Sequence, residues 1–197
     1  IKYQGAMTVG AGAKVILSNG TRSCNVFWIA EGAISVAAGA DVKGTLYSKT
    51  GAIDLGANTV LEGRMFSMAG AISTAIGVVA SLPPGTITIP IFCESECNAA
   101  PEVDVLGVLS DFALFTSAGI VGNTGASGIN GNIGTNAGAI TGFAGGIHIG
   151  TQEVANALTA KAVVDLEFAY SSLMMLPATA THTAVFLDET LAPGVYD

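Results

Sequence analysis

The 197-residue chain is apolar and acidic: half of its residues are hydrophobic, 11% are charged, and the formal net charge is −8. This length allows one domain with a full core, and the acidic balance argues against a surface for nucleic acid or an anionic membrane. No apolar run reaches the about 18 residues of a membrane-spanning helix, so we expect no membrane insertion.

The first 77 residues carry a repeat. The tripeptide Gly-Ala-Ile begins at Gly32, Gly51 and Gly70, 19 residues apart each time, and Gly5-Ala6-Met7 is a looser copy. A period of about 20 residues is typical of a solenoid. Each period holds three short strand-like runs separated by glycine-rich corners. The repeat therefore predicts a mainly β fold, in which three strands form each coil of a roughly triangular β-helix.

Aligning the coils on the repeat, with each isoleucine inward, predicts a flat outward surface of small side chains. One row consists of Thr8, Ser35, Asp54 and Ser73, and the neighbouring row consists of Ala6, Ala33, Ala52 and Ala71. The carboxylate of Asp54 interrupts the small and hydroxylic side chains. The next strand-like run carries scattered charges, as expected of a solvated face: Lys14, Asp41, Lys43 and Glu62.

A third row is aromatic. We expect Phe27, Tyr47 and Phe66 to align across three coils, with Met68 following two residues after Phe66. If Leu46 and its equivalents point inward, this strip points outward and is a candidate assembly surface, because exposed apolar patches mark interfaces. Two alternatives remain open. The inward and outward positions of the strand can be the reverse of those assumed here. Alternatively, the helix or connector of the same unit can cover the strip.

Residues 78–104 contain several prolines and two cysteines, and we interpret them as a connector or cap. Cys93 and Cys97 flank an acidic tripeptide, and in a secreted protein they are a candidate disulfide that would hold a tight turn. A metal site is the alternative, but it would need further ligands at suitable spacing. We therefore expect no metal and no other cofactor.

Residues 105–197 complete the expected unit. Up to residue 150 the sequence returns to short strand-like runs with Asn-Gly corners. From about residue 151 to 175 the chain lacks glycine and proline, and apolar residues recur at helical spacing. This pattern predicts one long helix with Thr151 as its N-cap and Pro177 just beyond its end, lying along the solenoid axis and covering one face.

Several separate motifs resemble the ice-binding-protein domain of bacteria and algae. One set resembles the N-terminal half of that domain: Phe112-Ala113-Leu114-Phe115-Thr116, Gly128-Ile129-Asn130-Gly131-Asn132-Ile133-Gly134-Thr135 and Thr190-Leu191-Ala192-Pro193-Gly194-Val195-Tyr196. Another resembles its C-terminal half: Asn25-Val26-Phe27-Trp28 and Leu61-Glu62-Gly63-Arg64. The resemblance implies a right-handed triangular β-helix with one helix alongside, a secreted or cell-surface location, and in many members adsorption to ice through one flat face.

The two halves stand in the opposite order to the family, and about one coil of connecting strands is missing. Three explanations remain open. The domain can be circularly permuted, the sequence can span parts of two tandem domains, or it can be one unit of an array whose coils the next unit completes. Open solenoid ends expose strand edges and need a cap or a neighbour.

These observations favour a non-catalytic structural unit of an extracellular filament or multi-domain cell-surface protein, with neighbouring copies of itself or tandem domains as partners. No nucleophile elbow, phosphate loop or dinucleotide fingerprint is present, and we expect no enzyme activity. The alternative is an ice-binding domain with ice as its partner. Its candidate face would consist of Thr8, Ser35, Ser73, Ala33, Ala52 and Ala71.

Overall fold

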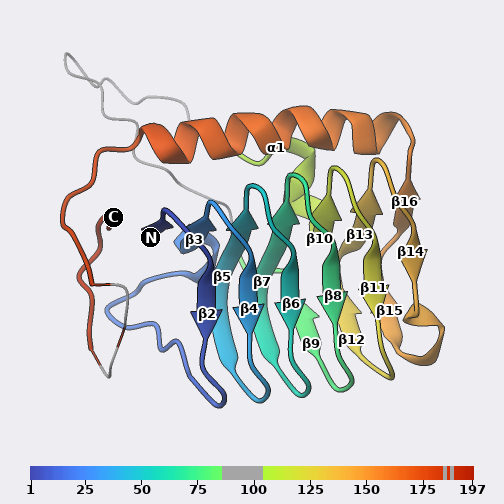
Figure 1. Ribbon diagram of the computed structural model, residues 1–197, viewed down its shortest axis with the longest axis horizontal. Coiled ribbons are helices and arrows are strands. Elements are labelled where there is room, and N and C mark those ends of the chain that lie inside the picture. The colour runs from blue at the N-terminus through green and yellow to red at the C-terminus, as the bar shows by residue number, and fades with distance from the viewer. Residues whose placement is uncertain (86–103, 184–185, 187–188) are drawn as a thin grey trace.

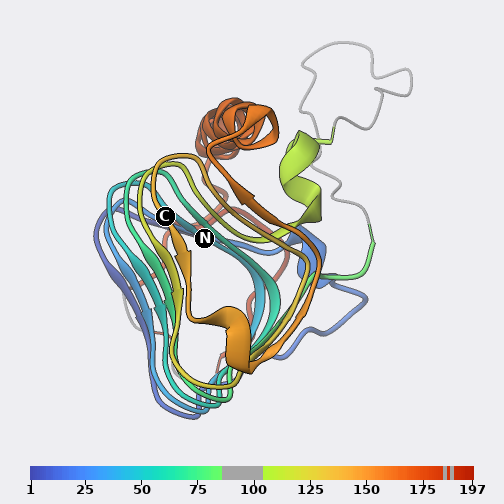
Figure 2. The same cartoon turned by 90° about the vertical axis from the view of Figure 1, so that its right-hand side faces the viewer.

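The computed structural model describes residues 1–85, 104–183, 186 and 189–197. Short parallel strands stack coil on coil into a β-solenoid, and one long helix lies along the stack (Figure 1). Viewed along its axis, the solenoid has three sides (Figure 2). The predicted fold class, a mainly β solenoid with a helix packed alongside, is thereby confirmed.

One side, which we call the flat face, is a six-stranded parallel sheet. Its strands are, in spatial order, β2 (Met7–Val9), β4 (Ile34–Val36), β6 (Ile53–Leu55), β8 (Ile72–Thr74), β11 (Val121–Asn123) and β14 (Ile140–Thr141). The first residue of each of these strands points inward. Ile34, Ile53, Ile72 and Val121 are fully buried, so the isoleucine of the repeat builds one wall of the core.

The other two sides share two long strands, β5 (Asp41–Ser48) and β7 (Val60–Ser67). The first half of β7 pairs with β9 (Val79–Ser81), and its last residues pair with β10 (Phe112–Thr116). The second side, the charged face, is completed by β12 (Gly128–Asn130) and β15 (Ile147–Ile149). The third side, the covered face, also contains β1 (Lys2–Tyr3), β3 (Phe27–Ala30), β13 (Asn132–Thr135) and β16 (Gln152–Val154).

The two segments on either side of residues 86–103 form one continuous stack. β7 pairs with β10, β8 with β11, and β9 with β12, all parallel. The expected connector, 78–104, therefore starts too early, because Val79–Ser81 already forms a strand of the charged face. Cys93 and Cys97, the candidate disulfide, lie outside the described residues. Short 3-10 turns occur at Ser23–Asn25 (η1), Gly107–Asp111 (η2) and Phe143–Gly145 (η3).

The helix α1 spans Ala157–Met175, six residues shorter at its start than predicted. Gln152–Val154 instead forms β16, which pairs with β13. Asn156, not Thr151, is the N-cap: its side chain accepts a hydrogen bond from the Thr159 backbone N–H, and the Thr159 hydroxyl accepts one from the Asn156 N–H. This reciprocal pair satisfies two amide groups that the first turn leaves unpaired. At the other end, Lys2 Nζ donates to the carbonyls of Met174 and Leu176.

The helix covers the aromatic strip. Tyr47 and Phe66 point out of the solenoid as expected, but both are fully buried beneath α1 together with Phe115, Leu166 and other apolar residues. The Tyr47 hydroxyl donates to the Leu166 carbonyl at 2.7 Å, and the rings of Tyr47 and Tyr170 lie 5.4 Å apart. The strip is therefore a second core of the same chain. It is not an exposed assembly surface.

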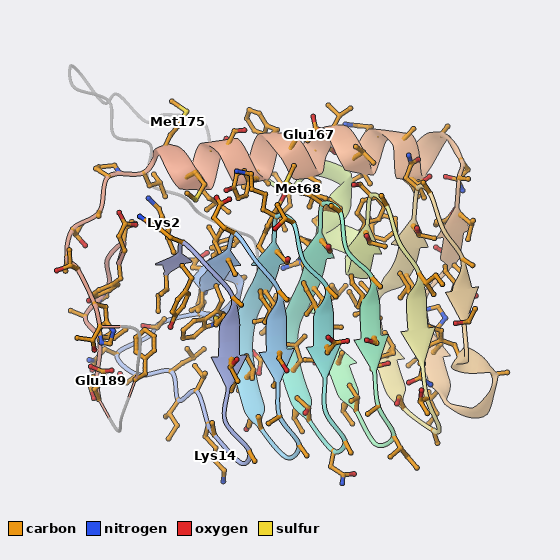
Figure 3. The ribbon with its side chains drawn as sticks, viewed as in Figure 1. Lys2, Lys14, Met68, Glu167, Met175 and Glu189 are labelled. Atoms are coloured by element: carbon orange, nitrogen blue, oxygen red, sulfur yellow. The ribbon has the colours of Figure 1, made fainter. Side chains whose placement is uncertain are left out.

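The expected alignment of the strip was also wrong at one position. Phe27 lies opposite Thr45, while Ile29 is the residue in register with Tyr47 and Phe66. The corner between β3 and β4 is one residue shorter than the corner between β5 and β6, because Ala30 pairs with Ser48 and Ile34 pairs with Ile53. The spacing of the tripeptide repeat does not predict this offset. Met68 is partly buried at the helix side of the stack (Figure 3) and packs against the same cluster.

Replacing Phe66 by alanine should lower the free energy of unfolding by about 3–5 kcal/mol, the usual loss for a fully buried aromatic side chain. Phe168→Ala is the matched control, because Phe168 is 53% exposed on the outer side of α1 and surface changes typically stay within about 0.5 kcal/mol. Urea unfolding measures both. Equal losses would contradict burial of the strip by the helix.

Close stacking at the corner between the charged and covered faces requires glycine. A Cβ atom on Gly63 would lie 1.8 Å from the carbonyl oxygen of Gly44 in the preceding coil. That distance is far inside van der Waals contact, so any larger residue would push the two coils apart. Gly44 itself has φ of 108°, a conformation that residues with a side chain rarely adopt.

We therefore expect Gly63→Ala to destabilise the fold by about 1–3 kcal/mol, as over-packing typically does. Gly128 provides the control, since it lies in β12 of the same sheet and a Cβ atom there would meet nothing within 4 Å. Thermal unfolding followed by circular dichroism compares the two variants. A Gly63→Ala protein as stable as Gly128→Ala would contradict the close approach of the coils.

Candidate functional site

Within the described part of the chain, no helix covers the other two sides of the solenoid, and these sides differ in chemistry. On the charged face, Lys43 Nζ lies 3.0 Å from Asp41 Oδ1 and 3.5 Å from Glu62 Oε2. Burial alone would lower the pKa of Lys43, but its hydrogen bonds to Asp41 and the charges of Asp41 and Glu62 outweigh burial and raise that pKa. Lys43 is therefore a cation at neutral pH, and this end of the face is a solvated ion-pair network.

The flat face carries the predicted row of small residues in register. Thr8 lies opposite Ser35, Ser35 opposite Asp54, and Asp54 opposite Ser73. The row continues through Gly122 to Thr141 on the last two strands. Thr8, Ser35, Asp54 and Thr141 are exposed, and Ser73 and Gly122 are partly exposed. The row therefore crosses all six strands of the sheet.

The alanine row lies beside it. Ile34 N–H donates to the Ala52 carbonyl and Ile53 N–H donates to the Ala71 carbonyl, so these alanines occupy equivalent positions at the edge of successive strands. Ala33 occupies the same position one coil earlier, where its carbonyl accepts from Met7 N–H. The structure thus brings together all six residues of the candidate face: Thr8, Ser35, Ser73, Ala33, Ala52 and Ala71.

Sequence reasoning missed the part of this face that follows residue 104. Gly138-Ala139-Ile140 is a further copy of the tripeptide and predicts Thr141 in the central row. In the fifth coil the tripeptide is Gly119-Ile120-Val121, so Ile120 replaces alanine, and it is 50% exposed. Its Cγ2 lies 3.9 Å from where Gly122 would carry a Cβ. The large side chain of Ile120 therefore lies beside Gly122, which has no side chain.

Buried hydroxyl groups hold the edge of the flat face in place. The hydroxyls of Ser67, Thr116 and Thr135 donate to the carbonyls of Gly51, Gly70 and Gly119, respectively. The Ser48 hydroxyl donates to the Gly32 carbonyl in the same way. Each acceptor is the glycine of a corner tripeptide. These bonds give the partly buried corner carbonyls a partner and tie each coil to its neighbour.

Asp54 is the one charged residue in the central row, which is fully described. Its carboxylate accepts a hydrogen bond from the Ser73 hydroxyl of the next coil. The described residues contain no group of three or more His, Cys, Asp or Glu side chains that could hold a metal ion. They also contain no helix long and apolar enough to cross a membrane. The two rows of the flat face thus present mainly hydroxyl and methyl groups, together with the carboxylate of Asp54 and the larger side chain of Ile120.

The sequence matches the Ice-binding-like family over residues 1–79 and 114–197. The chain belongs to this family, as the motifs of both halves predicted. The chain is also similar to ice-binding protein K1-A of Typhula ishikariensis, with 39% identity over 46 residues, which are 23% of this chain and 19% of that protein. This chain thus corresponds to a small part of that relative.

A solved structure of similar sequence is an ice-binding protein from an Antarctic bacterium of the Flavobacteriaceae. It is 34% identical and aligns with 91% of this chain and 41% of its own length, with a TM-score of 0.40. The chain covers less than half the length of either relative.

Proposed function

We propose that this domain binds ice through the flat face. The observation that supports the proposal most directly is the row of mostly small and hydroxylic residues that crosses six strands in register. Among the described residues, this side carries neither the helix nor the ion-pair network of the charged face. A hydroxyl group both donates and accepts hydrogen bonds, as a water molecule does. Parallel strands about 4.8 Å apart repeat such groups at a constant interval. A repeating surface of this kind suits a repeating ligand such as a crystal face.

The family assignment supports the same proposal, since both relatives reported above are described as ice-binding proteins. We further propose an extracellular or cell-surface location and a non-catalytic role, because ice contact takes place outside the cell and requires adsorption only. Inhibition of crystal growth or anchoring of a cell to ice would follow from such adsorption.

The filament hypothesis receives less support from the described residues. The aromatic strip, one of the features that suggested assembly, is buried under α1. At the last coil, the inward position opposite Ile129 holds His148, and that opposite Ile133 holds Gln152. Stacking another coil there would bury two polar side chains in place of apolar ones, which costs free energy unless each finds a new partner. Assembly with neighbouring copies remains a prediction.

A bulky residue in the central row should abolish ice adsorption without disturbing the fold. Ser35 is exposed in the middle of β4, so Ser35→Tyr would hold a crystal plane away from the face. Asn130→Tyr is the matched control, because Asn130 is exposed on the charged face. Inhibition of ice recrystallisation by the two purified variants is compared with that of the parent protein.

The expected result is loss of inhibition in Ser35→Tyr and full inhibition in Asn130→Tyr, with equal unfolding temperatures. The reverse pattern would assign ice contact to the charged face. A parent protein without any effect on crystal growth or shape would overturn the proposed function.

A further inference from the structure

We propose that Asp54 weakens adsorption at the flat face and so sets how strongly this domain holds a crystal surface. The proposal rests on the ice-binding function proposed above. Asp54 lies on β6, the third of the six strands, with Ser35 and Ser73 on either side of it in the central row. A contact that used the whole row could not avoid this side chain.

The carboxylate differs from its neighbours in the hydrogen bonds it can form. Thr8, Ser35 and Thr141 carry hydroxyl groups, which both donate and accept, whereas an ionised carboxylate only accepts. It therefore orients every adjacent water molecule with a hydrogen atom toward itself. Water molecules in ice each donate two bonds and accept two, so the hydration of Asp54 does not match a crystal surface.

The surroundings do not neutralise this charge. Among the ion pairs formed by described residues, none involves Asp54. Its one side-chain partner is the Ser73 hydroxyl. That bond directs the hydroxyl proton of Ser73 toward Asp54 and away from any ligand, so one carboxylate alters two positions of the row. Removing water from an unpaired charge costs free energy, and adsorption would require that at the centre of the contact.

The neighbouring coils indicate which residue would complete the row. Thr8 and Thr141 occupy equivalent positions on β2 and β14. Asp54→Thr would give a hydroxyl and a methyl group at this level and release the Ser73 hydroxyl. Threonine also favours strands more than aspartate does, so the substitution should not destabilise the fold. Without the carboxylate, four adjacent strands would present hydroxyl groups: β2, β4, β6 and β8.

The experiment measures the protein concentration that halves ice recrystallisation, for the parent, Asp54→Thr, Asp54→Asn and Glu167→Gln. Glu167 is exposed on the outer side of α1 (Figure 3), so Glu167→Gln removes one negative charge away from the flat face. We expect Asp54→Thr to act at a concentration about tenfold lower than the parent, a ratio equivalent to about 1.4 kcal/mol. Asp54→Asn should lie between them, and Glu167→Gln should equal the parent.

The controls separate this inference from the proposed function. If Ser35→Tyr abolishes activity but Asp54→Thr equals the parent or is weaker, the face binds ice and the role of Asp54 is refuted. If Asp54→Thr and Glu167→Gln improve activity equally, net charge and not position is responsible, which also refutes it. Adding Ser35→Tyr to Asp54→Thr should remove the gain. A gain that persists in the double variant would place the effect outside the flat face.

Discussion

The structure depends on the hydrogen bonds between buried hydroxyl groups and the corner carbonyls of the tripeptide repeat. In successive coils, Ser48, Ser67, Thr116 and Thr135 each donate to a corner glycine. The bond determines where each short strand of the flat face begins. Since a shift of one residue would turn every side chain to the opposite side of a strand, this constraint keeps isoleucine inside and small residues outside in coil after coil.

The helix gives the three sides different roles. Outward aromatic residues on one side would make an apolar surface open to association, but α1 packs on them and the Tyr47 hydroxyl donates to the Leu166 carbonyl. Burial raises the pKa of Tyr47, so its phenol stays a neutral donor. Tyr47 and Phe66 are thus buried beneath α1. The flat face adds little to this second core and carries mostly small residues, with Ile120 as a large exception.

Positions within the repeat were predictable, as was the body of the helix from its apolar spacing, but positions where neither period holds were not. Constant spacing of Gly-Ala-Ile placed Thr8, Ser35 and Ser73 in one row, since equal spacing implies equal positions on successive coils. The alignment of Phe27 failed because the corner between β3 and β4 is one residue shorter than the equivalent corner of the next coil. The helix start failed because Gln152–Val154 has no period of its own, and its strand conformation comes from pairing with β13. Tertiary pairing of this kind leaves no local signal.

The flat face and the core obey separate constraints, which explains how a charge can persist at position 54. Ile53 and Leu55 point inward from the same strand and are buried, while Asp54 points to solvent between them. Since successive side chains of a strand face opposite ways, the outward position can change without disturbing the packing of either neighbour. Folding therefore places little restriction on the residue at position 54. Any selection for aspartate at position 54 therefore acts on the surface of the domain. There, its carboxylate accepts a hydrogen bond from the Ser73 hydroxyl of the next coil.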